Sequence, residues 1–310
     1  MLCNLCPRRC NALRTETHGE GRCRMGTLPV VARAARHFWE EPCISGVNGS
    51  GTVFFCGCPL GCVFCQNAPI SQGALAGRAM TPRALSELFA RVEALNVHNL
   101  NLVSPTHFAP AILEALRLRK PSIPVVWNTS GYESEATLRA AEGLVDIYLP
   151  DLKYYKESTA RELSDAPDYF PVALRAVKAM CAQTGAPVYD GAGMLLRGTL
   201  VRHLVLPMRV DETVAILETI AEELPKGTPV SLMRQYTPMN GVTAKGLDRR
   251  LTAREYARAS DALFRLELDG YLQQKEAATS AFTPAFMDEE SVRLFGEEET
   301  EKTESVGNAE

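Results

Sequence analysis

The chain has 310 residues, 46% of them hydrophobic and 23% charged, which is the composition of an ordinary globular protein. Its formal net charge of -4 lacks the basic excess of nucleic-acid-binding proteins, and no apolar run approaches the roughly 20 residues of a membrane span. The length suits one α/β barrel or two smaller domains. The amino terminus, MLCNLCPRRC, shows no apolar secretory segment. Ten cysteines in such a chain favour the reducing cytoplasm, and metal or cluster ligation rather than disulfides.

The first 27 residues form a cysteine-rich segment with glycine, proline and arginine and almost no apolar periodicity. Its cysteines follow the spacing C-x2-C-x3-C-x12-C: Cys3, Cys6, Cys10 and Cys23. A small segment without an apolar core usually needs metals or cross-links to hold it together. The spacing suits zinc and also a second iron–sulfur cluster, so we expect a structural or electron-relay site at these thiols.

Residues 28–51 lead into the first strand of the predicted barrel. Ala32–Trp39 is interpreted as a strand or a short helix, and Ser45–Gly51 as a loop. Cys43 and Cys56 fall outside the cysteine patterns and are interpreted as buried or spare thiols. We expect three regions: a cysteine-rich segment with its lead-in loop (1–50), a barrel (51–270), and a C-terminal extension (271–310). The polar, acidic sequence after Phe286 predicts a disordered tail.

From Thr52 onward, short β-rich runs alternate with amphipathic runs of helical length. The predicted strands are Thr52–Phe55, Asn99–Val103, Pro124–Trp127, Val145–Leu149, Val201–Val205 and Pro229–Met233. The predicted helices are Pro82–Asn96, Phe108–Leu118, Glu133–Glu142, Asp168–Thr184, Asp211–Leu224 and Thr252–Leu268, with Thr81 and Thr252 as N-caps. This alternation implies α/β architecture with parallel strands, as a partial (β/α)6 TIM-type barrel or a doubly wound sheet. The absence of a G-x-G-x-x-G motif after a strand favours the barrel, and Val188–Leu200 predicts a hairpin before the fifth strand.

After the first predicted strand, Cys58, Cys62 and Cys65 are spaced C-x3-C-x2-C, with the aromatic Phe64 before the last cysteine. Structural zinc usually has four ligands in two close pairs, which this triad alone does not supply. An iron–sulfur cubane held by three thiolates keeps one iron free to bind a small molecule. Half of a zinc site, or thiols without function, are the alternatives. A loop at the end of an apolar strand suits the C-terminal mouth of a barrel.

Polar residues follow the other predicted strands, where a barrel places its functional groups. In chain order they are Ser104, Thr106 and His107; Asn128 and Thr129; Asp151 and Lys153; Arg202 and His203; and Gln235. A single Asn or Thr at a strand end is usually a helix cap. Five polar junctions together predict a polar ligand above the cluster.

The cysteine triad with Phe64 resembles the signature of the radical S-adenosylmethionine (radical SAM) superfamily. Three further segments resemble motifs of the glycyl-radical-enzyme activating enzymes, of which the pyruvate formate-lyase activating enzyme is the best known: Asp151-Leu152-Lys153, Asn128–Tyr132 and Val201–Pro207. The resemblance covers roughly residues 51–268. It implies a [4Fe–4S] cluster on the triad with SAM on its open iron. It also implies SAM contacts from Asp151 and Lys153, with Asn128, Thr129 and either Arg202 or His203 nearby.

Two motifs depart from those of the activating enzymes. SPTHF replaces the G-G-E segment that usually holds the amino group of SAM, so Ser104, Thr106 or His107 would have to make this contact. Asn128 replaces an aspartate that helps to bind a monovalent cation in the activating enzyme, which weakens the case for such a cation here. The cysteine-rich first 27 residues are also absent from the short activating enzymes. Together these features most resemble the radical SAM branch related to the pyruvate formate-lyase activating enzymes, whose members carry this N-terminal cysteine pattern.

The resemblance implies reductive cleavage of SAM to methionine and a 5′-deoxyadenosyl radical, with an electron from a flavodoxin- or ferredoxin-type donor. The radical would abstract a hydrogen atom from a glycyl radical enzyme, from another peptide or from a small molecule. Two other classes stay open from the residues alone. One is a non-catalytic zinc-binding module, and the other is an Fe–S electron carrier with Cys56 or Cys43 as fourth ligand. We expect neither nucleic acid nor a membrane as a partner.

Overall fold

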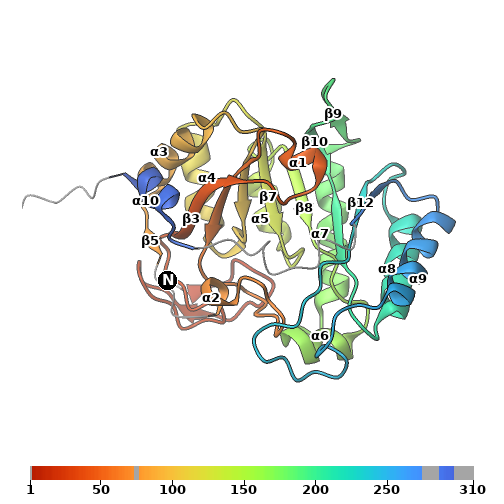
Figure 1. Ribbon diagram of the computed structural model, residues 1–310. Helices are drawn as coiled ribbons and strands as arrows, with labels where there is room; N and C mark the ends of the chain where they lie inside the picture. Colours follow the sequence, from red (N-terminus) through yellow and green to blue (C-terminus); the bar gives the residue numbers. More distant parts are fainter. Residues whose placement is uncertain (1, 73–76, 274–285, 297–310) are drawn as a thin grey trace, which may run out of the picture.

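The computed structural model describes residues 2–72, 77–273 and 286–296, and its centre is a curved, mainly parallel sheet (Figure 1). Neighbouring parallel strands follow in the order β4 (Ser50–Phe55), β6 (Leu100–Val103), β7 (Val125–Thr129), β8 (Ile147–Pro150) and β10 (Leu195–Thr199). β11 (Val201–Leu204) continues β10 beyond Leu200 and pairs in parallel with β12 (Val230–Met233). A parallel bridge between Asp151 and Arg202 joins β8 to β11, so the strands form one partial barrel.

The six predicted strands are all present, which confirms the α/β partial barrel. Strands such as β4 and β7 are buried along their whole length, as expected for parallel strands covered on both faces. A further parallel strand, β13 (Gly270–Leu272), pairs with β12 and was not predicted. It is short and partly exposed, so its sequence lacks the apolar run that identifies the others.

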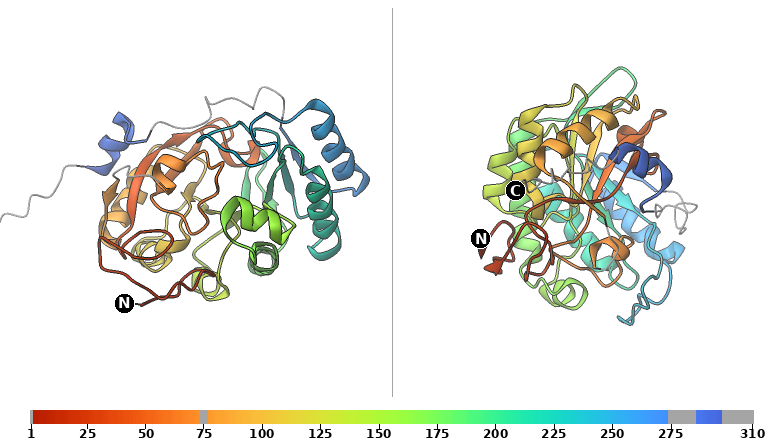
Figure 2. Two further views of the ribbon diagram at one scale, coloured as in Figure 1. Left: turned by 90° about the horizontal axis from the view of Figure 1, so that it is seen from below. Right: turned by 90° about the vertical axis from the view of Figure 1, so that its left-hand side faces the viewer.

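Helices pack on the outer face of the curved sheet (Figure 2). They are α3 (Pro82–Glu93), α4 (Ala109–Leu118), α5 (Glu135–Ala141), α6 (Glu157–Ser164), α7 (Tyr169–Thr184), α8 (Val210–Glu223) and α9 (Ala253–Arg265). The two predicted N-caps are confirmed: the hydroxyl of Thr81 accepts from the N–H of Ala84, and that of Thr252 from Glu255. α6 was not predicted. Within these described ranges, none of the helices is both long and apolar enough to cross a membrane.

Antiparallel strands border the parallel sheet. β3 (Val30–His37) pairs with β4 and with β5 (Arg78–Ala79), so the lead-in segment is a strand rather than a helix. β9 (Val188–Tyr189) pairs with β10, which confirms the predicted hairpin. The remaining short elements are β1 (Leu2–Cys3), β2 (Ala12–Leu13), α1 (Pro42–Ser45), α2 (Ala68–Ser71) and the 3-10 turn η1 (Thr106–Phe108).

The chain after Phe286 is not simply a tail. It contains α10 (Glu289–Phe295), capped by Asp288, whose carboxylate lies 3.0 Å from Nε of Arg33 on β3. The predicted tail was therefore wrong for this stretch, because a capped amphipathic turn packs on the sheet edge. Residues 297–310, the acidic end, lie outside the described residues. The region boundaries at residues 50 and 270 stay predictions.

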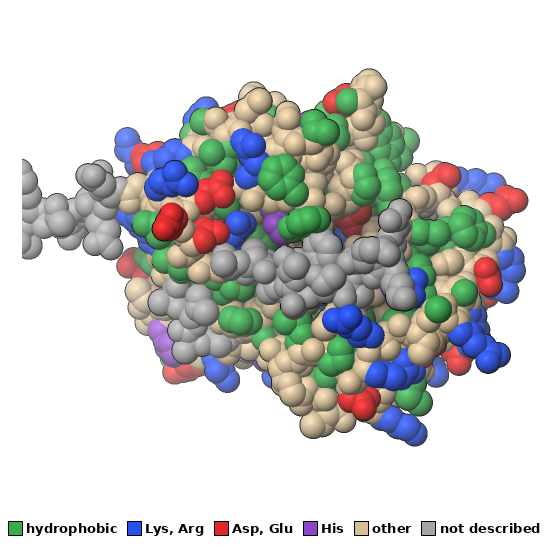
Figure 3. Space-filling model, in the orientation of Figure 1, with side chains coloured by type: hydrophobic (Ala, Val, Ile, Leu, Met, Phe, Trp, Pro, Cys, Tyr) green, Lys and Arg blue, Asp and Glu red, His purple; other side chains and the backbone are tan. Residues whose placement is uncertain are grey.

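Polar and apolar side chains are segregated between the interior and the surface. Trp127, Tyr148 and Phe55 are fully buried between the sheet and its helices. On the surface near α8 and α9, charged side chains of both signs are mixed (Figure 3), with ion pairs between α8 and α9 such as Arg265–Glu218 at 3.0 Å. Exposed pairs of this kind contribute little to stability.

Candidate functional site

The triad loop, residues 56–67, leaves the carboxyl end of β4 and leads into α2. Gly57 has a φ of 79°, and a Cβ there would lie 2.8 Å from the carbonyl oxygen of Cys23. Glycine is therefore required where this loop crosses the N-terminal segment. A turn between Cys62 and Cys65, closed by a 3.1 Å backbone hydrogen bond, aims the last cysteine back toward the barrel.

Each thiol of the triad accepts a hydrogen bond. The N–H of Leu60 donates to Cys58 Sγ at 3.4 Å, Ser164 Oγ to Cys62 Sγ at 3.0 Å and Ser71 Oγ to Cys65 Sγ at 3.4 Å. Burial, reinforced by the neighbouring thiols Cys62 and Cys58, raises the pKa of Cys65 to about 12. Burial and Cys62 likewise raise the pKa of Cys58. The three sulfur atoms are thus close enough to repel one another as thiolates, and bound iron would relieve that repulsion.

The triad alone does not supply the four ligands of a structural zinc site. A cubane held by three thiolates keeps one iron open, so the donor set of the triad fits a [4Fe–4S] cluster.

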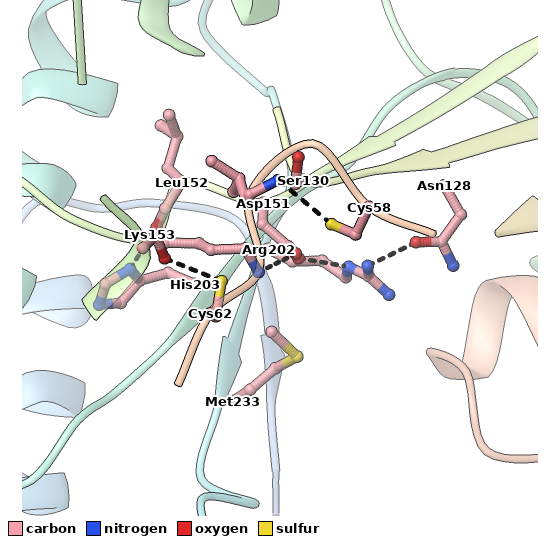
Figure 4. Close-up of polar contacts among 12 residues, drawn as sticks. Cys58, Cys62, Asn128, Ser130, Asp151, Leu152, Lys153, Arg202, His203 and Met233 are labelled. Atoms are coloured by element: carbon pink, nitrogen blue, oxygen red, sulfur yellow. Dashed lines mark hydrogen bonds and ion pairs between the residues drawn. The ribbon is translucent and has the colours of Figure 1, made fainter. Parts of the chain in front are cut away.

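Beside the triad, the ends of β7, β8 and β11 form a charged wall. Arg202 lies between Asp151 and Asn128 (Figure 4), with 3.1 Å from Nε to Asp151 Oδ1 and 2.6 Å from an Nη to Asn128 Oδ1. Lys153 Nζ donates to the other oxygen of Asp151. Burial alone would raise the pKa of Asp151, but the charges of Lys153 and Arg202 outweigh it and hold that pKa below its usual range. The carboxylate and both cations are therefore charged at neutral pH.

Glu40 completes this wall from the lead-in segment. Its Oε2 lies 3.1 Å from Arg202, and its Oε1 accepts from the side-chain amides of Asn101 and Asn128, each at 3.1 Å. Sequence reasoning missed Glu40, because an acidic residue before Pro42 carries no periodic signal. Only the antiparallel return of β3 beside β4 brings it into the barrel.

The wall and two thiols of the triad border one cavity of about 210 Å³, while Cys58 lines a neighbouring cavity together with Cys23. Of the predicted residues, its lining includes Cys62, Cys65, Asn128, Asp151, Lys153, Arg202 and Gln235. Phe54, Phe64, Leu204 and Met233 supply apolar lining. A cavity with two thiols, paired charges and an apolar side can hold a ligand that is partly charged and partly aromatic.

The structure does not bring the other predicted residues to this cavity. Thr106 and Thr129 both donate to the buried carboxylate of Glu133, at 2.7 Å. Side chains alternate along a strand, so Asn128 points into the barrel and Thr129 points away. The same alternation separates Arg202 from His203, whose ring contacts the Leu152 carbonyl and Thr213 Oγ1.

The residues that replace the G-G-E segment also lie elsewhere. His107 is buried, with Nε2 2.7 Å from the Cys56 carbonyl oxygen. Ser104 has a left-handed φ of 60° and does not line the cavity. Cys56 packs among apolar side chains such as Phe54 and Val103. Cys43 belongs to α1, at the opposite end of the sheet from α2 (Figure 1).

Comparison with known proteins agrees with these features. Residues 52–220 match the family model of the radical SAM superfamily. The uncharacterized protein MJ0674 of Methanocaldococcus jannaschii is 29% identical over 279 residues, which cover 86% of this chain and 75% of that protein.

Among solved structures, Streptococcus suis SuiB bound to S-adenosylmethionine is similar over 70% of this chain and 48% of its own, with 13% identity and a TM-score of 0.49. HydG, a maturase of the [FeFe]-hydrogenase, is similar over 69% of this chain and 48% of its own, with 14% identity and a TM-score of 0.48. This chain therefore spans about half the length of these two proteins. Because the match at residues 52–220 takes in more than half of its length, the chain belongs to the radical SAM superfamily.

Proposed function

We propose that this protein cleaves SAM reductively and removes a hydrogen atom from a protein substrate, with a glycine of a glycyl radical enzyme as the target. Membership of the superfamily implies a [4Fe–4S] cluster and SAM. The observation that carries the proposal is that two thiols of the triad and the charged wall line one cavity. The choice of glycine rests on the similarity of Asp151-Leu152-Lys153 and Val201–Pro207 to the activating enzymes.

Cys58, Cys62 and Cys65 would hold three irons of the cluster. When bound, the reduced cluster supplies one electron to the sulfonium of SAM, which yields methionine and a 5′-deoxyadenosyl radical. Asp151 is ionised and can accept hydrogen bonds from hydroxyl or amino groups of SAM. Lys153 and Arg202 keep their positive charge, because Asp151 opposes the effect of burial on the pKa of each. They suit the carboxylate of SAM.

The apolar side of the cavity has a separate role. Phe64 lies edge-on to Tyr236, with ring centroids 5.9 Å apart, and Phe54, Leu204 and Met233 also line the cavity. The side chains of Phe54, Phe64, Leu204 and Met233 present apolar surface to the cavity and would exclude water from it. Hydrogen transfer then balances as 5′-deoxyadenosyl radical plus substrate C–H giving 5′-deoxyadenosine plus a substrate radical.

The SAM cleavage step is tested by anaerobic reconstitution with iron and sulfide, reduction, and addition of SAM. We expect 5′-deoxyadenosine from the wild type and from Cys56→Ser, and none from Cys62→Ala. An electron carrier ligated by Cys56 would instead lose its cluster in Cys56→Ser. Stoichiometric zinc in place of iron, or an intact reduced cluster that yields no nucleoside, would overturn the proposal.

The substrate step needs its own experiment. Inactive pyruvate formate-lyase serves as the probe, and electron paramagnetic resonance (EPR) detects a carbon-centred radical on it. The control is the same probe with its radical-bearing glycine replaced by alanine. If 5′-deoxyadenosine forms but no glycyl radical appears, SAM cleavage stands and the substrate becomes another peptide or a small molecule.

A further inference from the structure

The four N-terminal cysteines gather in one small unit. The β1–β2 hairpin places Cys3 opposite Ala12, and turns at Cys6–Arg9 and Gly21–Arg24 are closed by backbone hydrogen bonds of 3.1 and 2.9 Å. The Cys6 thiol interacts electrostatically with Cys23, Cys3 and Cys10, and Cys23 interacts with Cys3 and Cys10. A Cβ on Gly21 would lie 2.8 Å from Cys10 Sγ, so the second turn packs directly on that thiol.

The sulfur atoms of Cys6 and Cys23 accept backbone hydrogen bonds in the same way as two sulfur atoms of the triad loop. The backbone N–H of Arg8 donates to Cys6, and that of Met25 donates to Cys23, in each case from two residues ahead. The triad loop repeats this spacing, because Leu60 donates to Cys58 and Asn67 donates to Cys65. Such N–H groups stabilise the negative charge of a ligating thiolate.

A buried cation also lies among the N-terminal thiols. Arg14 is 7% exposed, and one of its Nη atoms lies 3.6 Å from Cys3 Sγ. Its Nε donates at 3.0 Å to the carbonyl of Met25, which follows Cys23 closely in the chain. A thiolate-ligated metal group is anionic, and a fixed guanidinium beside it offsets part of that charge.

The place of these thiols favours a redox-active group. Cys23 and Cys58 line the same cavity, so a metal group on the N-terminal thiols would lie beside the triad. Zinc has no redox chemistry, whereas a cubane with one thiolate on each iron transfers single electrons.

We propose that Cys3, Cys6, Cys10 and Cys23 bind a second [4Fe–4S] cluster, fully ligated by protein, beside the triad. Four thiolates leave no iron open, so this cluster cannot bind SAM. Cys23 and Cys58 line the same cavity, of about 360 Å³, so the two ligand sets are neighbours. The cluster would accept one electron from a flavodoxin- or ferredoxin-type donor and pass it to the triad cluster. That relay role rests on the proposed function, but the presence of the cluster does not.

The test counts metal in a chain that cannot hold the triad cluster. The variant Cys58→Ala/Cys62→Ala/Cys65→Ala is reconstituted anaerobically, and its iron, sulfide and zinc are measured. We expect about four irons and four sulfides per chain, against about eight of each in the wild type. On reduction, its EPR signal should not change when SAM is added. Cys3→Ser/Cys6→Ser should keep about four irons, with an EPR signal that SAM does change. The matched control Cys181→Ser should keep about eight.

Zinc without iron in the triple variant overturns the proposal, and so does the absence of any metal. If the triple variant fails to fold, Cys62→Ala and the double variant Cys10→Ser/Cys23→Ser take its place. The double variant leaves two N-terminal thiols, too few to hold a cubane, so it should lose about four irons. Cys10 is exposed and Cys23 partly exposed, so the helical circular dichroism should not change. Four irons in the triple variant with no SAM cleavage by the wild type would uphold this cluster and overturn the proposed function alone.

Discussion

The two cysteine regions, residues 2–26 and 56–67, share a construction and differ in what surrounds them. In both, short turns present thiols that accept backbone N–H groups from two residues ahead. The N-terminal region has four thiols and a buried arginine, Arg14, that donates to the backbone carbonyls of Met25 and Gly26. The triad has three thiols and faces a cavity with a charged wall. The absence of a fourth thiol from the triad and the nearby paired charges are the features on which the proposed SAM site rests.

The regions are also tied together. Arg8 of the N-terminal region donates to the carbonyl oxygen of Pro59 at 2.8 Å and to that of Leu60 at 3.3 Å, both within the triad loop. Arg22 donates to the same Leu60 carbonyl at 3.2 Å. The N-terminal region therefore braces the loop that carries the triad, while the barrel supplies the chemistry of the cavity.

The largest expected effect comes from replacing a residue of the charged wall, which lies beside the triad only. Arg202→Met leaves Asp151 and Glu40 buried with one cation fewer, since Arg202 pairs with both at 3.1 Å. Breaking a buried ion pair from one side costs about 3–5 kcal/mol, to be measured as the loss in free energy of unfolding. The proposed SAM site also loses a polar group, so we expect 5′-deoxyadenosine formation to fall about 100-fold.

The matched control is Arg258→Met, which removes an exposed ion pair with Asp211. We expect a change within about 0.5 kcal/mol and unaltered SAM cleavage. The N-terminal iron should stay in place in both variants. Equal effects of the two substitutions would show that the wall has no special role in the site.

The next largest effect is expected from replacing Arg8, which connects the N-terminal region to the triad loop. Arg8→Gln removes donors to four carbonyls, of Pro59, Leu60, Ser164 and Asp165. Charged hydrogen bonds contribute roughly 1.5–3 kcal/mol, so we expect about 2–3 kcal/mol less stability and slower SAM cleavage. Arg9→Gln, at the exposed neighbour, is the control and should change neither. If Arg8→Gln lowers the N-terminal iron content but not SAM cleavage, the two regions are not coupled through this side chain.

The sequence predicted the features that a local pattern encodes. It failed for side chains whose place depends on the face of the strand from which they project. The spacing of Cys58, Cys62 and Cys65 and the apolar strands identified the barrel and one border of the cavity. At Asn128-Thr129 and Arg202-His203, strand alternation sends one side chain inward and one outward, so only Asn128 and Arg202 reach the cavity. The alternation was available in the sequence and would have separated these pairs. Glu40 could not be found, since its place depends on a long-range strand pairing.

The junction of the two regions should be sensitive to acid. His107 contacts the Cys56 carbonyl, and burial lowers the pKa of His107 to about 4, against the opposing effect of this hydrogen bond. The unfolded chain, with a pKa near 6.5, binds the proton first, so stability is full above pH 6.5 and falls as the pH drops toward 4. At pH 5.5 the loss is about 1.4 kcal/mol for this histidine.

Anaerobic unfolding at pH 7.5 and 5.5 measures this loss. His107→Gln should lose about 1.4 kcal/mol less than the wild type over that interval. His203, on the far side of the barrel wall, also has a pKa lowered to about 4 by burial, so His203→Gln is the matched comparison. The two effects should add, because the histidines share no contact. A pH dependence unchanged in His107→Gln would show that this histidine is protonated equally in both states.

The smallest expected effect is a change in the reduction potential of the triad cluster alone. Ser164 Oγ donates to Cys62 Sγ at 3.0 Å and contacts the Tyr154 hydroxyl at 2.6 Å. A donor to a ligating sulfur stabilises the more negative, reduced cluster, so Ser164→Ala should lower the potential of the triad cluster. A hydrogen bond of about 1 kcal/mol corresponds to roughly 40 mV for one electron. Anaerobic titration followed by EPR, read at the signal that responds to SAM, measures this shift.

Ser71→Ala is the matched comparison. The hydrogen bond from Ser71 Oγ to Cys65 Sγ is longer, at 3.4 Å, so its loss should shift the potential of the triad cluster less. The signal that does not respond to SAM should keep its potential in both variants, because neither serine contacts an N-terminal thiol among the described hydrogen bonds. Parallel shifts of both signals would mean that the two regions hold one electronically shared group rather than two clusters.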